Sequence, residues 1–418
     1  MSFGIAGLSL SPAKPRLPAH FTPDREVHVI VSTLAGNQNA SEYYQKTLDP
    51  FLTSKLPHLK LKENYFVHTT TSPTSIAHLT KTLFLFNAKK GVKQTLILLS
   101  GDGGIVDIVN TLTTTLQREI DDSRPPSIFF KPAICLVPCG TANALAWSLN
   151  VARDPLKAIW DGRARALPQF EVTFSKQARL VTDEGRQQRE FVSAGVHEEN
   201  RSDVRVAVET QQTALAGQEG YFDPNGRVRI YGCVVFSWGL HASLVALSDT
   251  SGKRKHGLDR FKVAAKELIE EGHVYKGQVR VHKDRHSEWE HLGDPDNNRH
   301  WYILATLVSN LEEKYRISPA SKPLDGVLRL IRIDATEPAE TLSAIMMQAY
   351  ENGRHIESEA VQYEAIDGLR IDFDEEEDRW RQVCVDGKIV TIEKGGFVEV
   401  RNMAAGGVDG RRVVEVVS

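Results

Sequence analysis

The chain has 418 residues, of which 41% are hydrophobic and 25% charged, and its formal net charge is −3. These values are typical of a globular protein of two or three domains with a hydrophobic core, without the strong basic field that attracts nucleic acid or anionic membranes. Four cysteines are too few for a disulfide framework, which indicates a reducing compartment. Because no apolar run reaches the ~18 residues of a membrane-spanning helix, we expect a cytoplasmic protein that associates only transiently, and peripherally, with intracellular membranes.

Short apolar runs alternate with helical patterns in the first part of the chain. After an irregular, proline-containing leader (1–25), the runs are 27–32, 64–70, 95–100 and 133–138. Continuous apolar runs are typical of parallel strands buried on both faces. Between them, apolar residues recur at helical spacing, as after the third run at Ile105, Ile108, Val109, Leu112 and Leu116. The pattern predicts an α/β domain over residues 26–165, with a parallel sheet and ligands at the strand carboxyl ends.

The hydrophobicity pattern changes in the second part of the chain. Alternating, β-rich segments separated by polar turns fill residues 166–400 and predict an antiparallel β-sandwich. Residues from about 195 to 226 interrupt this pattern with low hydrophobicity, which indicates a surface insertion or a disordered loop. Residues 401–418 follow as a C-terminal tail.

The four predicted strands of the first domain end in segments rich in Gly, Ser, Thr and Asn. These segments are 32–39, 69–74, 100–104 and 138–146. Small residues and hydroxyl groups at one edge of a parallel sheet suit a polyphosphate, whose oxygens need close N–H and O–H donors. Neither the P-loop pattern nor Gly-x-Gly-x-x-Gly is present, so the segments predict a nucleotide site of another kind.

Asp102 lies in the stretch "LLSGDGGIVDIVNTL", residues 98–112. The glycines allow a ligand to approach the backbone, and the helix that follows offers a positive dipole end to an anion. A carboxylate in that position opposes an anionic ligand unless the carboxylate itself takes part in the chemistry. The alternative is that Asp102 caps the helix that begins near Ile105.

"SGDGGIVDIVN" followed by "PCGTANALA" resembles the diacylglycerol kinase catalytic family, which includes sphingosine and ceramide kinases. The likeness continues through "FSWGLHASLVALSDTSGKRKHGLDRF" and "VCVDGKIV", and covers residues 27 to 400 apart from the insertion. The order of these segments is most like that of the sphingoid-base kinases. The resemblance implies a nucleotide-binding α/β domain joined to a β-sandwich domain that binds the lipid.

The resemblance also implies roles for individual residues. Asp102 matches the general base that takes a proton from a lipid hydroxyl. The positions that match or neighbour the family's nucleotide contacts are Ser32, Gly36, Asn37, Thr70, Thr71, Ser72, Ser100, Gly101, Gly103, Gly104, Asp107, Gly140, Thr141, Asn143, Arg254, Arg260, Asp386, Gly387 and Lys388. The polar candidates on the lipid side are Ser237, Ser243 and Asp249. The resemblance implies an Mg²⁺ ion that accompanies ATP, but it does not identify the residues that bind this ion.

Two departures from the family pattern concern charge. The first loop keeps Gly36 but has lost the lysine usual near it, and the C-terminal Asp-Gly-Glu has become Asp386-Gly387-Lys388. Lys388 thus offers a cation where another has been lost. On the lipid side, Ser243 and Val245 replace acidic residues, which favours a neutral head group because a buried ammonium without a carboxylate partner is costly.

These features predict an ATP- and Mg²⁺-dependent lipid kinase acting on a hydroxyl of a sphingoid base or a related lipid such as diacylglycerol or ceramide. A catalytically silent relative that binds nucleotide or lipid as a regulator is the alternative that the two charge departures favour. A relative of the NAD or sugar kinases is disfavoured by the Trp238-Gly239 segment and the predicted sandwich. The expected partner is a lipid at a membrane surface rather than nucleic acid, and the sequence indicates no oligomeric state.

Overall fold

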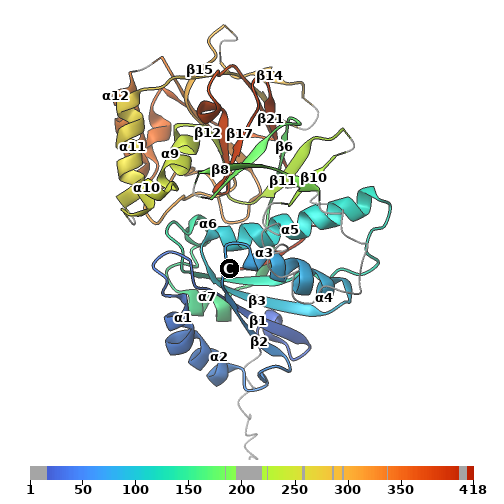
Figure 1. Cartoon of the computed structure of the whole chain (residues 1–418). Coiled ribbons are helices and arrows are strands. Elements are labelled where there is room, and N and C mark those ends of the chain that lie inside the picture. Colours follow the sequence, from blue (N-terminus) through green and yellow to red (C-terminus); the bar gives the residue numbers. More distant parts are fainter. Residues whose placement is uncertain are drawn as a thin grey trace, which may run out of the picture.

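The computed structural model describes residues 17–183, 185–193, 219–223, 225–256, 259–284, 287–293, 296–336, 338–403 and 412–418. Two lobes are visible, an N-terminal lobe drawn mostly in blue and cyan and a second lobe drawn mostly in green to red (Figure 1). The insertion expected at about 195–226 falls mostly outside the described residues.

The N-terminal lobe is built on a six-stranded sheet with the order β2-β1-β3-β4-β22-β5. Its strands are β1 (Arg25–Ser32), β2 (Tyr65–Thr70), β3 (Lys93–Ser100), β4 (Ala133–Pro138), β5 (Ala164–Ala166) and β22 (Glu415–Val417). The strands β1 to β4 are parallel, as the apolar runs predict. Alternate residues of one strand enter two hydrophobic clusters, with Leu96 and Leu98 in one and Ile97 and Leu99 in the other. The sheet is therefore buried on both faces.

Helices cover both faces of this sheet. They are α1 (Ala40–Tyr43), α2 (Asp49–Lys55), α3 (Ser75–Leu79), α4 (Leu85–Lys89), α5 (Asp102–Asp121), α6 (Ala144–Ser148) and α7 (Pro155–Asp161), with π-helical turns at Tyr44–Leu48 and Thr80–Phe84 and a 3₁₀ turn at Ala19–Phe21. Leu52 of α2 and Ile159 of α7 belong to one hydrophobic cluster, whereas Ile76 of α3 and Ile105 of α5 belong to the other. This is the α/β architecture that the sequence predicts.

Strand β22 brings residues far along the chain back into the first sheet. Its backbone pairs in parallel with β4 and antiparallel with β5. Residues 401–418, expected to form a tail, thus contain a strand of the N-terminal lobe. The apolar run at residues 413–417 explains the difference, because Val416 and Val417 are buried in that sheet.

Helix α5 lies between the two lobes (Figure 1). Its predicted apolar face packs under the sheet, but its opposite face is also buried. There, Asn110 Oδ1 accepts the backbone N–H of Tyr231 at 2.9 Å, and the Thr113 hydroxyl donates to Gln169 Oε1 at 3.0 Å. The polar side of this helix is therefore an interface with the second lobe.

The second lobe is a 16-stranded sheet over the described residues, antiparallel except where β9 pairs with β10. Its strands are β6 (Phe170–Phe174), β7 (Arg179–Thr182), β8 (Gln187–Glu190), β9 (Val192–Ser193), β10 (Glu219–Phe222), β11 (Val228–Gly232), β12 (Val235–Gly239), β13 (Tyr275–His282), β14 (Glu290–His291), β15 (Arg299–Thr306), β16 (Leu328–Asp334), β17 (Val361–Ile366), β18 (Gly368–Phe373), β19 (Gln382–Val385), β20 (Lys388–Thr391) and β21 (Phe397–Asn402). The sheet curls so that Trp238 of β12 packs edge-on against Phe373 of β18, with ring centroids 5.2 Å apart. The predicted antiparallel sandwich is confirmed.

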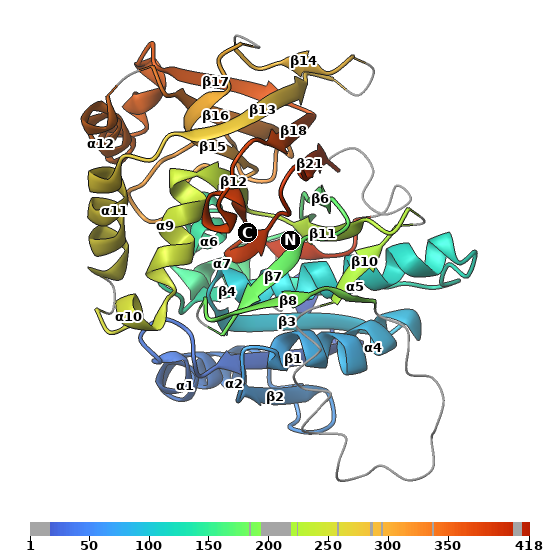
Figure 2. The same cartoon turned by 45° about the horizontal axis from the view of Figure 1, so that its top comes forward.

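Helices flank this sheet on one side. They are α9 (Leu240–Ser248), α10 (Ser251–Arg254), α11 (Arg260–Glu271) and α12 (Ala339–Met347), with 3₁₀ turns at Gln348–Tyr350, Arg354–Glu357 and Asp378–Arg381. Figure 2 shows α9, α11 and α12 together at the same side of the lobe. Throughout the part of the chain described, no helix combines the length and apolar character needed to cross a membrane.

Candidate active site

Three glycines at the carboxyl edge of the first sheet pack loop against loop. Gly36 follows β1, Gly101 follows β3 and Gly140 follows β4. A β-carbon on Gly36 would collide with the carbonyl oxygen of Cys139, and one on Gly101 would lie 3.0 Å from the α-carbon of Gly140. Gly36 also has a φ of +48°, which favours glycine. Close packing of these loops therefore requires glycine at positions that the resemblance assigns to the nucleotide.

Of the remaining glycines predicted to contact the nucleotide, Gly103 and Gly387 leave open space and Gly104 does not. A β-carbon on Gly104 would lie 2.6 Å from the hydroxyl of Ser100, so this glycine also serves packing. At Gly103 and Gly387, by contrast, no heavy atom of the described residues lies within 4 Å of where a β-carbon would stand. Of these glycines, Gly103 and Gly387 are the ones beside which a ligand has room to approach the backbone.

The Asp102 carboxylate binds a neighbouring helix. Its Oδ2 accepts the backbone N–H of Ala144 at 2.7 Å, and its Oδ1 accepts that of Leu145 at 3.0 Å. Asp102 is thus the first residue of α5 and also caps the start of α6. Burial raises the pKa of its carboxyl, and the two backbone N–H groups oppose that rise. Each oxygen keeps a further lone pair for another proton donor.

Asn143 shapes the turn that presents those N–H groups. It adopts a left-handed conformation, with φ of +55°, and its side chain accepts the N–H of Gly140 at 2.9 Å and donates to the Gly140 carbonyl at 2.8 Å. Thr141 beside it is exposed, as is Asn37 in the first loop. Asn143 therefore organises the loop, while Thr141 and Asn37 face solvent.

Asp386 provides a second carboxylate held by backbone. It accepts the N–H groups of Cys233, Val234 and Val235 at 2.7, 3.0 and 2.6 Å. The pKa of the Asp386 carboxyl is raised to about 6. Burial is the main cause and the charge of Asp102 adds to it, while the three N–H groups oppose the rise. Asp386 of the second lobe thus lies within electrostatic range of Asp102 of the first.

Lys388 and Asp107 join the same group. Lys388 begins β20, and its Nζ lies 2.7 Å from Oδ1 of Asp107, one helical turn beyond Gly103 on α5. The two side chains are 26% and 15% exposed. An ion pair between residues 281 positions apart thus ties the second lobe to the N-terminal lobe beside Asp386.

The loop after β2 is closed by its own hydroxyl groups. Ser32 and Thr70 are paired in register at the ends of β1 and β2, and both are buried. The hydroxyl of Ser75 accepts the backbone N–H groups of Thr71 and Ser72 at 3.2 and 3.0 Å. Several polar groups predicted to contact a nucleotide therefore already have partners within the loop.

Arg254 and Arg260, also predicted to contact phosphate, have neighbouring residues of the second lobe as partners. Arg254 is bonded to both carboxylate oxygens of Asp249, at 2.9 and 3.0 Å. A predicted nucleotide contact is thus paired with a predicted lipid contact, and these contacts do not join Arg254 to the Asp102 group. Arg260 begins α11, with its guanidinium carbon 5.0 Å from the centroid of the Phe261 ring.

The two serine candidates on the lipid side are buried and internally bonded. Ser237 Oγ lies 2.7 Å from Nδ1 of His241, and Ser243 Oγ accepts the hydroxyl of Tyr275 at 2.7 Å. Burial lowers the pKa of His241 to about 4, so the ring is neutral at pH 7. Sequence reasoning missed His241, although a polar residue within the apolar run 240–247 was a visible signal.

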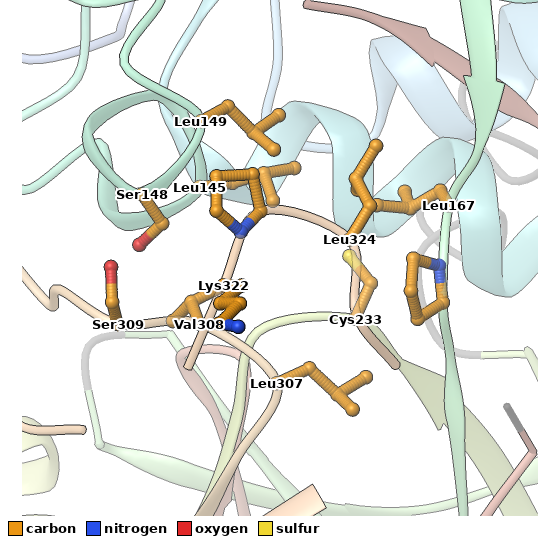
Figure 3. Close-up of a pocket in the computed structure, with 12 residues that line it drawn as sticks. Leu145, Ser148, Leu149, Leu167, Cys233, Leu307, Val308, Ser309, Lys322 and Leu324 are labelled. Atoms are coloured by element: carbon orange, nitrogen blue, oxygen red, sulfur yellow. The ribbon is translucent and has the colours of Figure 1, made fainter. Parts of the chain in front are cut away.

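A small cavity adjoins Leu145 and Cys233, whose backbone N–H groups bind the two carboxylates. Figure 3 shows it between leucines of the α6 segment, such as Leu145 and Leu149, and Leu307 and Leu324 of the second lobe. Its volume of about 10 Å³ accommodates roughly one water molecule and no acyl chain. Cys233 also lines it, so the cavity adjoins the backbone that binds Asp386.

Backbone groups complete the site, and no sequence motif points to them directly. The N–H groups that hold Asp102 and Asp386 come from the start of α6 and from residues 233–235 between β11 and β12. Any residue type supplies a backbone N–H, so only the fold reveals which ones converge.

Comparisons with known proteins agree with this arrangement. Residues 26–172 match the family model described as diacylglycerol kinase catalytic domain. No curated protein matches the chain. The fold is similar to that of a proposed diacylglycerol kinase from Bacillus anthracis str. Sterne, with 13% identity, a TM-score of 0.52, and coverage of 94% of this chain and 96% of the other.

Two further structures from the same organism cover the same shares of the chains. One is described as a diacylglycerol kinase, with 12% identity, and the other as a proposed one, with 13%; both have a TM-score of 0.49. The family match supports a diacylglycerol kinase-type catalytic domain over residues 26–172 and does not single out the sphingoid-base kinases.

Proposed function

We propose that the protein is an ATP-dependent lipid kinase, with residues 26–165 as the nucleotide-binding domain and residues 166–400 as the lipid-substrate domain. The observation that carries the proposal is a double link between α5 and residues 386–388, in which Lys388 pairs with Asp107 and Asp386 lies within electrostatic range of Asp102. This group lies at the carboxyl edge of a parallel sheet, where α/β proteins bind their ligands. Asp102 and Asp107 also lie within residues 26–172, which match the catalytic domain model.

Asp102 acts in this proposal as the general base. Its raised pKa increases its affinity for the proton of a lipid hydroxyl, while the N–H groups of Ala144 and Leu145 fix the direction of the carboxylate. As the proton moves to Asp102, the alcohol oxygen bonds to the terminal phosphorus of ATP and ADP leaves. Positioning and electrostatics supply most of the catalysis in such transfers.

The residues present fit a magnesium ion that arrives with ATP. Magnesium is usually held by one or two carboxylates together with substrate phosphates. Asp102 is assigned to the lipid hydroxyl and Asp386 is held by three backbone N–H groups, so Asp107, which is held only by the side chain of Lys388, is the carboxylate we assign to it. Within the described ranges, no three His, Cys, Asp or Glu side chains form a metal site of their own. Bound to ATP, the ion neutralises charge on the phosphates.

The acceptor in this proposal is a sphingoid base or a related lipid such as diacylglycerol or ceramide, reached during transient contact with intracellular membranes by a cytosolic enzyme. Ser237, Ser243 and Asp249 are the proposed lipid contacts. Since all three are bonded within the protein, binding must exchange those bonds for bonds to the lipid.

A catalytically silent relative is the second candidate. The observation that favours it is the Lys388–Asp107 ion pair, which occupies a carboxylate that we assign to magnesium. Such a relative would bind nucleotide or lipid without transferring phosphate.

Phosphate transfer from labelled ATP to sphingosine, phytosphingosine, ceramide and diacylglycerol in detergent micelles tests the proposal. We expect one lipid to be labelled, and Asp102→Asn to reduce transfer by about 10³-fold, at the level expected for loss of a general base. Because Asp102 also caps α6, melting temperature and ATP affinity are measured on the same variant to separate misfolding from lost chemistry. ATP binding without transfer to any lipid would instead identify the silent relative.

A further inference from the structure

The three carboxylates of the proposed site are held in two different ways. Asp102 and Asp386 accept backbone N–H groups, which cannot move without unravelling α6 or the 233–235 turn. Asp107 is held by the flexible ammonium side chain of Lys388 at 2.7 Å. Only this last pairing can exchange partners without a change in the backbone.

Both members of the pair border open space. Gly387 precedes Lys388 in the chain, and Gly103 lies one helical turn before Asp107 on α5. Of the glycines predicted to contact the nucleotide, these are the two at which a β-carbon would meet no heavy atom within 4 Å, apart from chain neighbours and the helix's own backbone. An anion that enters there reaches the ammonium, and a cation that enters with it reaches the carboxylate.

The charges of the pair are complementary to those of a metal-bound nucleotide. The first loop carries Gln38, an uncharged residue, in the segment where the family has a lysine. Lys388 is therefore the cation that a hydrogen bond holds at one of the site's carboxylates, that of Asp107. A charge-assisted bond from ammonium to phosphate is as strong as the one to carboxylate that it would replace.

We propose that the Lys388–Asp107 pair exchanges partners when the nucleotide binds. Lys388 leaves Asp107 for a phosphate of ATP, and Asp107 takes the magnesium that accompanies the phosphates. Metal-free ATP competes with Asp107 for Lys388 and leaves that carboxylate unpaired, whereas magnesium-bound ATP supplies a partner to both. This inference rests on the proposed function and concerns nucleotide binding alone.

The test is a titration of each variant with ATP in EDTA and with magnesium-bound ATP, without lipid. Lys388→Gln is expected to weaken ATP binding about tenfold in both conditions, the effect of one charge-assisted contact. Asp107→Asn is expected to tighten metal-free ATP about fivefold, because Lys388 is released, and to abolish most of the gain that magnesium gives the wild type. Lys388→Arg should keep most of the affinity.

A second ion pair provides matched controls. Lys89 and Glu119 form a pair in the N-terminal lobe whose side chains are 26% and 23% exposed. Lys89→Gln and Glu119→Gln should lower the melting temperature as much as the two site variants do and leave both ATP affinities unchanged.

The opposite signs in EDTA distinguish exchange from a simple tie between lobes. If Asp107→Asn and Lys388→Gln both weaken metal-free ATP in step with their melting temperatures, or if neither changes it, the exchange is refuted while lipid kinase activity can still stand. A wild-type protein that binds no ATP in either condition refutes the proposed function itself.

Discussion

The loops at the edge of the first sheet and the polar residues that follow β12 in the second lobe are held in place differently. In the loops, carboxylates and Asn143 bind backbone N–H and C=O groups, and glycines let main chains touch. In the second lobe, side chain binds side chain, as between Ser243 and Tyr275. A main-chain arrangement depends on a few residue types that a motif records, whereas side-chain pairs can be rewritten by substitution. This difference fits the sequence, in which the glycine-rich motifs of the first lobe are kept and Ser243 and Val245 replace acidic residues in the second.

Gly140→Ala and Gly103→Ala test the loops at the edge of the first sheet, and we expect them to change the unfolding free energy in opposite directions. The β-carbon at position 140 would collide with Gly101, so we expect a loss of about 2–3 kcal/mol in unfolding free energy. At position 103 the β-carbon meets nothing described and the residue lies in a helix, so alanine should stabilise by about 0.5–1 kcal/mol. If phosphate approaches Gly103, that more stable variant should nevertheless bind ATP more weakly.

Chemical denaturation and ATP titration of both variants check this expectation. Equal stability of the two variants would show that the loops do not depend on glycine for packing. Undiminished ATP affinity in Gly103→Ala would remove Gly103 from the binding surface.

Asp386→Asn tests the backbone-held carboxylate through pH. The folded-state pKa of Asp386 is raised from 3.8 to about 6, so the folded protein binds this proton more tightly than the unfolded chain. Its contribution to stability is therefore complete below about pH 4 and is lost as pH rises through about 6. Relative to Asp386→Asn, the wild type should lose up to about 3 kcal/mol across this interval.

Urea denaturation of both proteins at several pH values from about 4 to 7 measures this difference. A difference that stays constant over that range would mean that Asp386 does not titrate with a raised pKa.

Ser243→Ala is expected to have the smallest effect. It leaves the buried hydroxyl of Tyr275 without its acceptor, which should cost about 1 kcal/mol in unfolding free energy. ATP affinity should be unchanged, because Ser243 is buried and its hydroxyl is bonded to Tyr275 rather than to the Asp102 group. Ser54→Ala, at an exposed serine of α2, serves as the control for stability. A fall in ATP affinity would mean that this serine belongs to the nucleotide side after all.

Local pattern was sufficient to predict β1 to β4 of the first lobe and the antiparallel character of the second, but it missed β22. Runs such as 95–100 and 133–138 are apolar throughout because both faces of the first sheet are covered, and the structure has strands there. The pattern failed where burial involves polar residues. Thr113 and Asn110 look like the solvent face of α5, yet they are bonded to the second lobe.

The candidate site was predictable in its residues and not in its contacts. Asp102 and Asp107 stand out in the sequence, and so does the charge change at Lys388. That Asp102 caps α6 rather than its own helix, and that Lys388 reaches Asp107, depends on the packing of distant segments. No periodicity or spacing carries that information.

The position of β22 has a consequence for how the chain reaches its native state. Residues 415–417 stand between β4 and β5 in the sheet. Those two strands therefore have no hydrogen-bonded strand connecting them until the whole second lobe has been synthesised. On the ribosome, the N-terminal lobe must wait for its final strand, and removal of the last four residues should open a gap between β4 and β5 in the lobe that was made first.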